Sequence, residues 1–176
     1  MPFRDLVASG RADGWELHLI GGCDSANREY FNAVRKAALG LPVHLHLNAS
    51  GAALEDLVSS ASIYWHAGGY GEDPEAHPDR FEHFGIAVVE AMSAGAVPVV
   101  FAAAGPAEIV RDGLDGIHWR STGEFQDATA GLIADPRSLG PDVVVGGRSK
   151  HRVQPRRVHS MCEPPRRGGD HRIGDS

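Results

Sequence analysis

Two glutamates near the middle of the chain are the residues whose spacing most suggests chemistry. Glu82 and Glu90 stand eight positions apart in EHFGIAVVEAMSAG, and the segment between them is mostly apolar. We expect a buried helix over residues 85–94, which puts Glu82 ahead of its N-terminus and Glu90 one to two turns into it. Both carboxylates can then accept paired hydrogen bonds from vicinal hydroxyls of one polyhydroxy ligand.

The start of this expected helix also offers backbone donors. Unpaired N–H groups near Phe84, Gly85 and Ile86 would favour an anion or the hydroxyl oxygens of a sugar, and a glycine permits close approach of the backbone. A purely structural alternative makes Glu82 an acid that complements the helix dipole and Glu90 a rim residue. The apolar surroundings of Glu90 favour a ligand, because a charge there needs a partner.

Alternating apolar strands and amphipathic helices position these residues. We expect strands over residues 15–20, 43–47, 62–66, 97–101 and 117–119, and helices over 25–39, 50–60, 85–94, 106–111 and 121–134. This order predicts an α/β fold, a Rossmann-like parallel sheet with helices on both faces.

Ligands bind such sheets beyond the carboxyl ends of the strands. Residues 67–71, 82–86 and 102–105 all follow expected strands or open the expected helix, so we expect them to face one crevice. Gly69 lies in the first of these segments, where it either approaches a ligand or turns the chain.

Composition and charge divide the 176 residues into two parts. Residues 1–140 are acidic, which argues against nucleic-acid binding, whereas residues 141–176 are basic, lack hydrophobic periodicity and are predicted to be disordered. The two cysteines suggest neither a disulfide framework nor a metal motif, so a cytoplasmic location is expected. The sequence has no apolar run long enough for a transmembrane segment.

A possible metal pair occurs on the second expected strand. His44 and His46 alternate and therefore share a face of that strand. A His-x-His metal site is conceivable, but the sequence places no third ligand beside it, so half-buried strand positions are the favoured interpretation.

The stretch EHFGIAVVEAMSAGAVPVVFAAAGPAEIVRDGLDGIHW resembles the retaining glycosyltransferases of family four, which have the GT-B fold. Their two glutamates separated by seven residues are matched by Glu82 and Glu90. Their small-Gly-x-Pro-Val element is matched by residues 94–99, and later elements by residues 105–110 and 115–116. The resemblance covers about residues 3–137.

This resemblance implies roles for individual residues. Glu82 would be the catalytic residue, binding the transferred sugar and aiding the developing oxocarbenium charge, and Glu90 would bind the ribose of the donor nucleotide. Backbone amides would hold sugar hydroxyls or phosphate oxygens at Phe84, Gly85 and Ile86. Residues 47–50, Asn48 among them, would flank the base. Enzymes of this family generally need no metal or other cofactor.

The resemblance also leaves parts of the family pattern unmatched. The acceptor-binding domain and the Arg–Lys pair that clamps the diphosphate are not found in these residues. We therefore expect residues 1–140 to be an incomplete nucleotide-sugar-binding domain of an enzyme that transfers a hexosyl group, with a separate chain as one source of the acceptor domain. The alternatives are a non-catalytic remnant that at most binds nucleotide sugar weakly, and a GT-B epimerase.

Overall fold

The computed structural model describes residues 1–135 with their side chains and residues 156–161 as backbone. The strands are β1 (Trp15–Gly21), β2 (Val43–Leu47), β3 (Ala61–His66), β4 (Val97–Phe101), β5 (Ile117–Trp119) and β6 (Arg156–Met161). The helices are α1 (Pro2–Ala8), α2 (Arg28–Ala38), α3 (Gly51–Ser59), the 3-10 helix η1 (Pro78–Arg80), α4 (Ile86–Ser93), α5 (Ala104–Ile109) and α6 (Thr122–Ala134). No helix among these described residues is long and apolar enough to cross a membrane.

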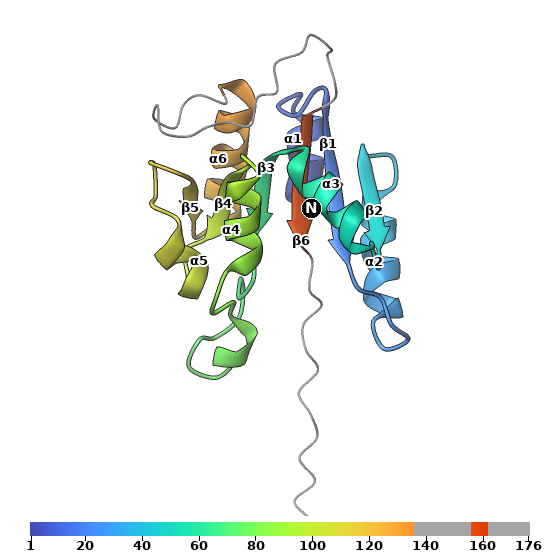
Figure 1. Ribbon diagram of the computed structural model, residues 1–176. Helices are drawn as coiled ribbons and strands as arrows, with labels where there is room; N and C mark the ends of the chain where they lie inside the picture. Colours follow the sequence, from blue (N-terminus) through green and yellow to red (C-terminus); the bar gives the residue numbers. More distant parts are fainter. Residues whose placement is uncertain (136–155, 162–176) are drawn as a thin grey trace, which may run out of the picture.

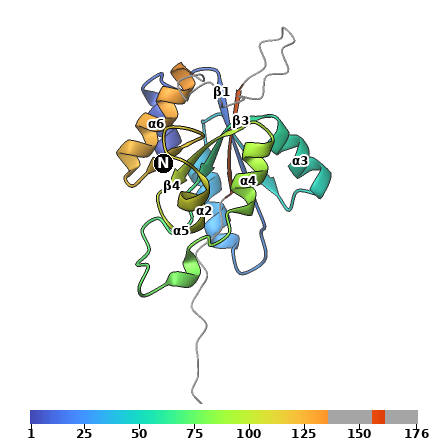
Figure 2. The ribbon, with the colours of Figure 1, turned by 60° about the vertical axis from the view of Figure 1, so that its left-hand side comes forward.

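The strands form one parallel sheet in the order β2-β1-β6-β3-β4-β5 (Figure 1). Helices α1 and α6 cover one face, whereas α3 and α4 cover the other, as Figure 2 shows. This confirms the predicted α/β class, a Rossmann-like sheet enclosed between helices. All strands run in one direction, so the loops that follow their carboxyl ends gather at one edge of the sheet.

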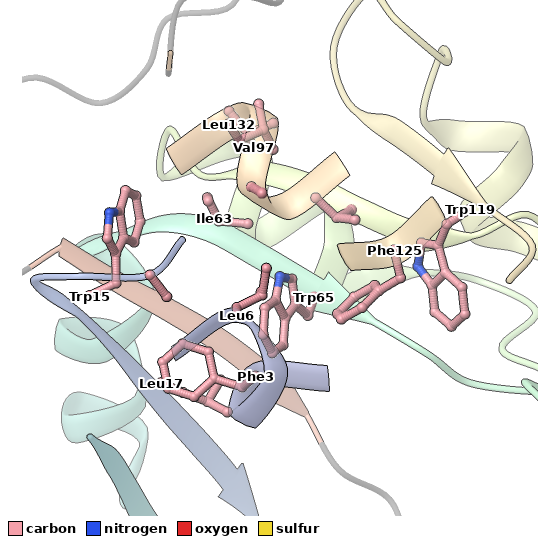
Figure 3. Close-up of a cluster of buried hydrophobic side chains, with 13 residues drawn as sticks. Phe3, Leu6, Trp15, Leu17, Ile63, Trp65, Val97, Trp119, Phe125 and Leu132 are labelled. Carbon is pink, nitrogen blue, oxygen red and sulfur yellow. The ribbon is translucent and has the colours of Figure 1, made fainter. Parts of the chain in front are cut away.

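The larger hydrophobic core lies between this sheet and helices α1 and α6. Trp65 of β3 packs edge-on against Phe125 of α6 with ring centroids 4.7 Å apart, and against Phe3 of α1 at 6.0 Å (Figure 3). Trp119 of β5 extends the same aromatic group toward Phe125 at 5.0 Å. This packing fixes β3 and its neighbours, whose ends carry the candidate site.

Serine caps explain where two of the helices begin. Ser50 accepts a hydrogen bond at Oγ from the amide of Ala53, and Ser121 accepts one from the amide of Glu124. Glu124 in turn accepts from the amide of Arg120 at 2.7 Å, which completes a variant of a capping box. These local signals account for the close agreement between expected and observed helix starts.

Helix α2 packs more loosely than its amphipathic pattern suggests. None of its residues is fully buried, and Phe31 and Val34 are only half-buried. They line a small apolar cavity of about 40 Å³ together with Leu19 and Leu45 of β1 and β2. The helix therefore covers the sheet near β2 without a filled core beneath it.

Strand β6 differs from the sequence-based expectation for the basic segment. We expected residues 141–176 to lack regular structure, whereas residues 156–161 form a strand that pairs with β1 on one side and β3 on the other. Pairing on both sides satisfies backbone groups of β1 and β3 that would otherwise face a gap in the sheet. Residues 136–155 and 162–176 lie outside the described residues, so the expectation of disorder there stays a prediction.

Candidate functional site

The candidate site lies where β3 and β4 end, and the structure brings the three predicted strand-end segments together there. The amide of Gly105, after β4, donates a hydrogen bond of 3.0 Å to the carbonyl oxygen of Glu82. Gly68, after β3, lies on the other side: a Cβ added there would be 3.7 Å from the Cβ of Glu82. The backbone around Glu82 is therefore held between the loops that follow two adjacent strands.

The carboxylate of Glu82 organises the start of α4. Its Oε1 atom accepts hydrogen bonds from the amides of Phe84 at 2.9 Å and Gly85 at 3.0 Å. These two backbone bonds lower the pKa of Glu82, although partial burial opposes them. The amides of Phe84 and Gly85, two of the three that we expected to face a ligand, are thus bonded to Glu82 itself. This is a structural role at the helix start, as in the alternative interpretation of Glu82.

Glycine is required at the N-cap of α4. Gly85 has φ 59° and is buried, and a Cβ at this position would lie 2.8 Å from Cδ1 of Ile109. The amide of Ile86, the first of the helix, has no acceptor among residues 1–135. The Ile86 amide is therefore a donor that this helix start can offer to a ligand.

Glu90 lies on the exposed face of α4. It is four residues beyond Ile86, which puts both on the same side of the helix, and Val89 beside them is also exposed. The expectation that this helix is buried is wrong, since only Val88 and Ala91 are buried. The argument that burial forces Glu90 to find a partner therefore fails, because water solvates its charge.

His66, the last residue of β3, is a site residue that the sequence analysis missed. Burial lowers the pKa of this imidazole, while the nearby negative charge of Glu82 partly opposes that shift. Its Nδ1 atom is buried without a hydrogen-bond partner among the described side chains and backbone. The sequence could have indicated His66 by its position, because it is the last residue of the expected strand SIYWH and directly precedes a strand-end loop.

Gly69 lies close to the segment that carries Glu82, whereas Asn48 lies far from it. Gly69 is buried with φ 82°, and an added Cβ would overlap the ring of Phe81, so the chain turns tightly there beside the site. Asn48 follows β2, where its Oδ1 atom accepts a hydrogen bond of 3.2 Å from the amide of Cys23. It lies three strands from β3, at a spacing of about 14 Å.

A cleft of about 340 Å³ opens beside the site. It is lined by Glu72, Pro74, Pro78, Phe81, His83, Phe101, Ala103 and Ala104. The loop that forms its outer wall is braced by an ion pair of 2.7 Å between Arg80 and Glu72. The cleft thus lies between the loop after β3 and the end of β4, next to the segment that carries Glu82.

A parallel sheet with a helix start and a cleft at the ends of its central strands defines a Rossmann-like ligand-binding domain. The sequence matches the model of the family described as "Glycosyl transferases group 1" over residues 3–139. The chain belongs to this family.

A curated relative adds a more specific comparison. The "GDP-Man:Man(3)GlcNAc(2)-PP-Dol alpha-1,2-mannosyltransferase" of Dictyostelium discoideum is 36% identical over 102 residues. The match covers 54% of this chain and 18% of the relative. The chain therefore corresponds to a minor part of the length of that protein.

Proposed function

We propose that this chain binds a nucleotide sugar at the ends of β3 and β4 and serves as the donor-binding domain, residues 1–140, of a retaining glycosyltransferase of family four. Membership of the glycosyltransferase family supports the class of reaction. The observation that carries the location is the junction at Glu82, where a carboxylate, a helix start and two strand-end loops meet. Hexosyl transfer from the donor is the proposed reaction.

Glu82 is the proposed catalytic residue. Its hydrogen bonds to two amides fix the carboxylate, and the lowered pKa keeps it ionised at neutral pH. A fixed negative charge beside the reacting sugar would stabilise the positive charge that develops as the glycosidic bond to the diphosphate breaks. The second carboxylate oxygen, Oε2, is left to accept a hydrogen bond from a sugar hydroxyl.

Glu90 is the proposed partner of the donor ribose. Its carboxylate stands on the exposed face of α4, four residues beyond the amide of Ile86. A ligand lying along this face would place vicinal ribose hydroxyls on Glu90 and a sugar or phosphate oxygen on that amide. Asn48, some three strands away, is proposed to lie beside the base, and Gly69 to line the turn nearest the sugar.

The remaining proposals concern the donor, the acceptor and the location. GDP-mannose is the first donor to test, because the name of the matched relative contains it. Phe84 is 77% exposed and Ile86 64% exposed beside the site, which supports further polypeptide, such as a separate chain, covering this surface to bind the acceptor. We also propose a cytoplasmic location, consistent with the cysteine content.

Calorimetry with GDP-mannose, UDP-glucose and the free nucleotides tests donor binding. We expect the wild-type chain to bind one of these donors, and Glu90→Gln to weaken that binding about tenfold through loss of charge-assisted hydrogen bonds. Glu75→Gln, an exposed carboxylate of the outer loop, is the matched control and should leave affinity unchanged. Equal affinities for all three proteins, or no heat with any donor, would contradict the proposal.

A transfer assay separates an enzyme from a binding domain. When an acceptor and any partner polypeptide are supplied, we expect the α-linked donor sugar to appear in an α-linked product, as proton NMR of the anomeric signal reports. Glu82→Gln should retain donor binding and lose most of the transfer rate. An inverted product would contradict the retaining mechanism, and undiminished transfer by Glu82→Gln would contradict the role of Glu82.

A further inference from the structure

A second group of chemically capable side chains lies on β1 and β2 at one edge of the sheet, away from the ends of β3 and β4. Glu16 and His18 lie on β1, and His44 and His46 lie on β2. Residues that are two apart in a strand point to the same face, and the register pairs His18 with His44. Adjacent parallel strands thus gather one carboxylate and three imidazoles on one patch.

We infer that Glu16, His18 and His44 form a binding site for a divalent transition metal of the zinc class. One ligand atom from each of these residues lies within 4.8 Å of the other two. A carboxylate with two imidazoles is a ligand set that zinc takes in proteins, with a water in the fourth position. The sequence alone offered only the His44 and His46 pair, whereas the register supplies Glu16 and His18.

The distances within this group fit a metal better than direct hydrogen bonds. Oε2 of Glu16 is 3.5 Å from Nε2 of His18, and Oε1 of Glu16 is 3.7 Å from Nε2 of His44. Both distances exceed the usual N–H···O range. Zinc–ligand bonds of the usual lengths place tetrahedral ligand atoms about 3.3–3.5 Å apart, so a small movement of the half-exposed His44 would close the site.

His46 is placed to orient one of the ligands. Its Nε2 atom is 2.9 Å from Nδ1 of His18. When Nε2 of His18 binds a metal, Nδ1 carries the ring proton and donates to His46, which fixes both the tautomer and the plane of the ring. The planes of the His18 and His46 rings lie within 10° of parallel, and the ring centroids are 5.1 Å apart. His46 is therefore a positioning residue for this site.

The exposure of the group allows a metal to enter and to keep a water ligand. The side chain of His18 is 6% exposed, that of Glu16 is 27% exposed and that of His44 is 49% exposed. The site therefore has a buried ligand at its base and an open side at the edge strand β2. A bound ion would join β1 to β2 and stabilise this edge of the sheet.

Metal titration of the full chain tests the inference. We expect calorimetry with Zn²⁺ at pH 7 to give one equivalent, the Tm to rise with added Zn²⁺, and Co²⁺ to give the visible bands of a tetrahedral site. Glu16→Gln and His44→Ala should each weaken binding by about tenfold or more. His46→Gln should weaken it less, while the Co²⁺ spectrum stays tetrahedral.

Because the chain has ten histidines, the control is His77→Ala, which removes an exposed imidazole from the outer loop and should leave affinity and stoichiometry unchanged. Circular dichroism checks that each variant is folded. If Glu16→Gln fails to fold, His44→Ala still tests the inference. We expect this variant to fold, because His44 is half-exposed on an edge strand. Absence of Zn²⁺ binding, or equal binding by wild type and His44→Ala, would overturn the inference.

Discussion

Glu82 and Glu16 are two carboxylates of one sheet in contrasting settings. Glu82 follows β3 in a loop, and its carboxylate accepts hydrogen bonds from backbone amides of the same loop. Glu16 lies within β1, where the backbone groups take part in the hydrogen bonds of the sheet, and among the side chains that the structure describes the imidazoles of His18 and His44 lie 3.5 Å and 3.7 Å from its carboxylate. The same type of side chain thus meets backbone donors after a strand end and, among the described residues, other side chains within a strand.

This contrast explains why the two regions suit different ligands. At the strand ends, a helix start leaves N–H groups that can meet oxygen atoms of a sugar or a phosphate. Within the strands, chemistry depends on side chains that the register brings together, and nitrogen and carboxylate ligands suit a metal ion. Variants that alter one region should therefore leave the other unchanged.

The largest effect is expected from Gly105→Ala. An added Cβ would overlap the carbonyl group of His83, which forms the junction with the Glu82 segment. We expect the free energy of unfolding to fall by about 1–3 kcal/mol and donor binding to be lost. Chemical denaturation measures the first effect and calorimetry the second.

The matched control is Gly131→Ala, on an exposed position within α6 where an added Cβ meets nothing within 4 Å. It should stabilise the protein by about 0.5–1 kcal/mol, because alanine favours the helix. If Gly105→Ala behaved like this control, the described contact between the two loops would be wrong.

A smaller effect is expected from Glu82→Ala, which removes the acceptor for the amides of Phe84 and Gly85. We expect a loss of about 1 kcal/mol at pH 7, as for other helix-start caps. Since the folded pKa lies below the unfolded one, the contribution is present above the unfolded pKa and disappears as pH falls through the folded value. Urea denaturation of both proteins from pH 7 to pH 3 tests this, and a difference independent of pH would contradict it.

A further prediction concerns the coupling between His66 and Glu82. NMR titration of the His66 ring should give a pKa below 6.5 because of burial, and Glu82→Gln should lower this pKa further by removing an attractive charge. The unfolded chain binds the proton more readily, so stability should decline as pH falls from 6.5 toward the folded pKa. An unchanged His66 pKa in Glu82→Gln would show that the two groups are not neighbours.

The smallest effect is expected from Tyr70→Phe. The hydroxyl of Tyr70 is 2.9 Å from Oγ1 of Thr122, and its ring packs beside Phe101 and Trp119. Loss of this exposed hydrogen bond should cost about 0.5 kcal/mol while the ring contacts remain. Thermal unfolding measures the change, and a loss above about 1.5 kcal/mol would indicate that the hydroxyl does more than this bond.

The sequence predicted the elements that depend on local signals. Runs of mostly apolar residues indicated β3 and β4, because a strand buried on both faces has no polar alternation. Amphipathic segments over residues 50–60 and 121–134 indicated α3 and α6. The exposed face of α4 escaped prediction, since Ile86 and Val89 are apolar and nothing in a single sequence shows that they remain uncovered.

Features that depend on tertiary placement could not be predicted from the sequence. Strand β6 has no alternating pattern in RRVHSM, and its place between β1 and β3 is seen only in the strand order of the sheet. The metal-binding group likewise depends on the register that sets His18 beside His44. For the candidate site, the sequence identified Glu82 and Gly85 but not the bond between the Glu82 carboxylate and the amides of Phe84 and Gly85.

The most direct test of the account is an NMR titration of the isotope-labelled chain with the nucleotide sugar that binds in calorimetry. The amide signals of residues 67–71, 82–90 and 102–105 should shift with added donor, whereas those of Glu16, His18 and His44 should not. The same experiment with Zn²⁺ should give the reverse pattern. Donor shifts confined to residues far from the ends of β3 and β4 would contradict the proposed site.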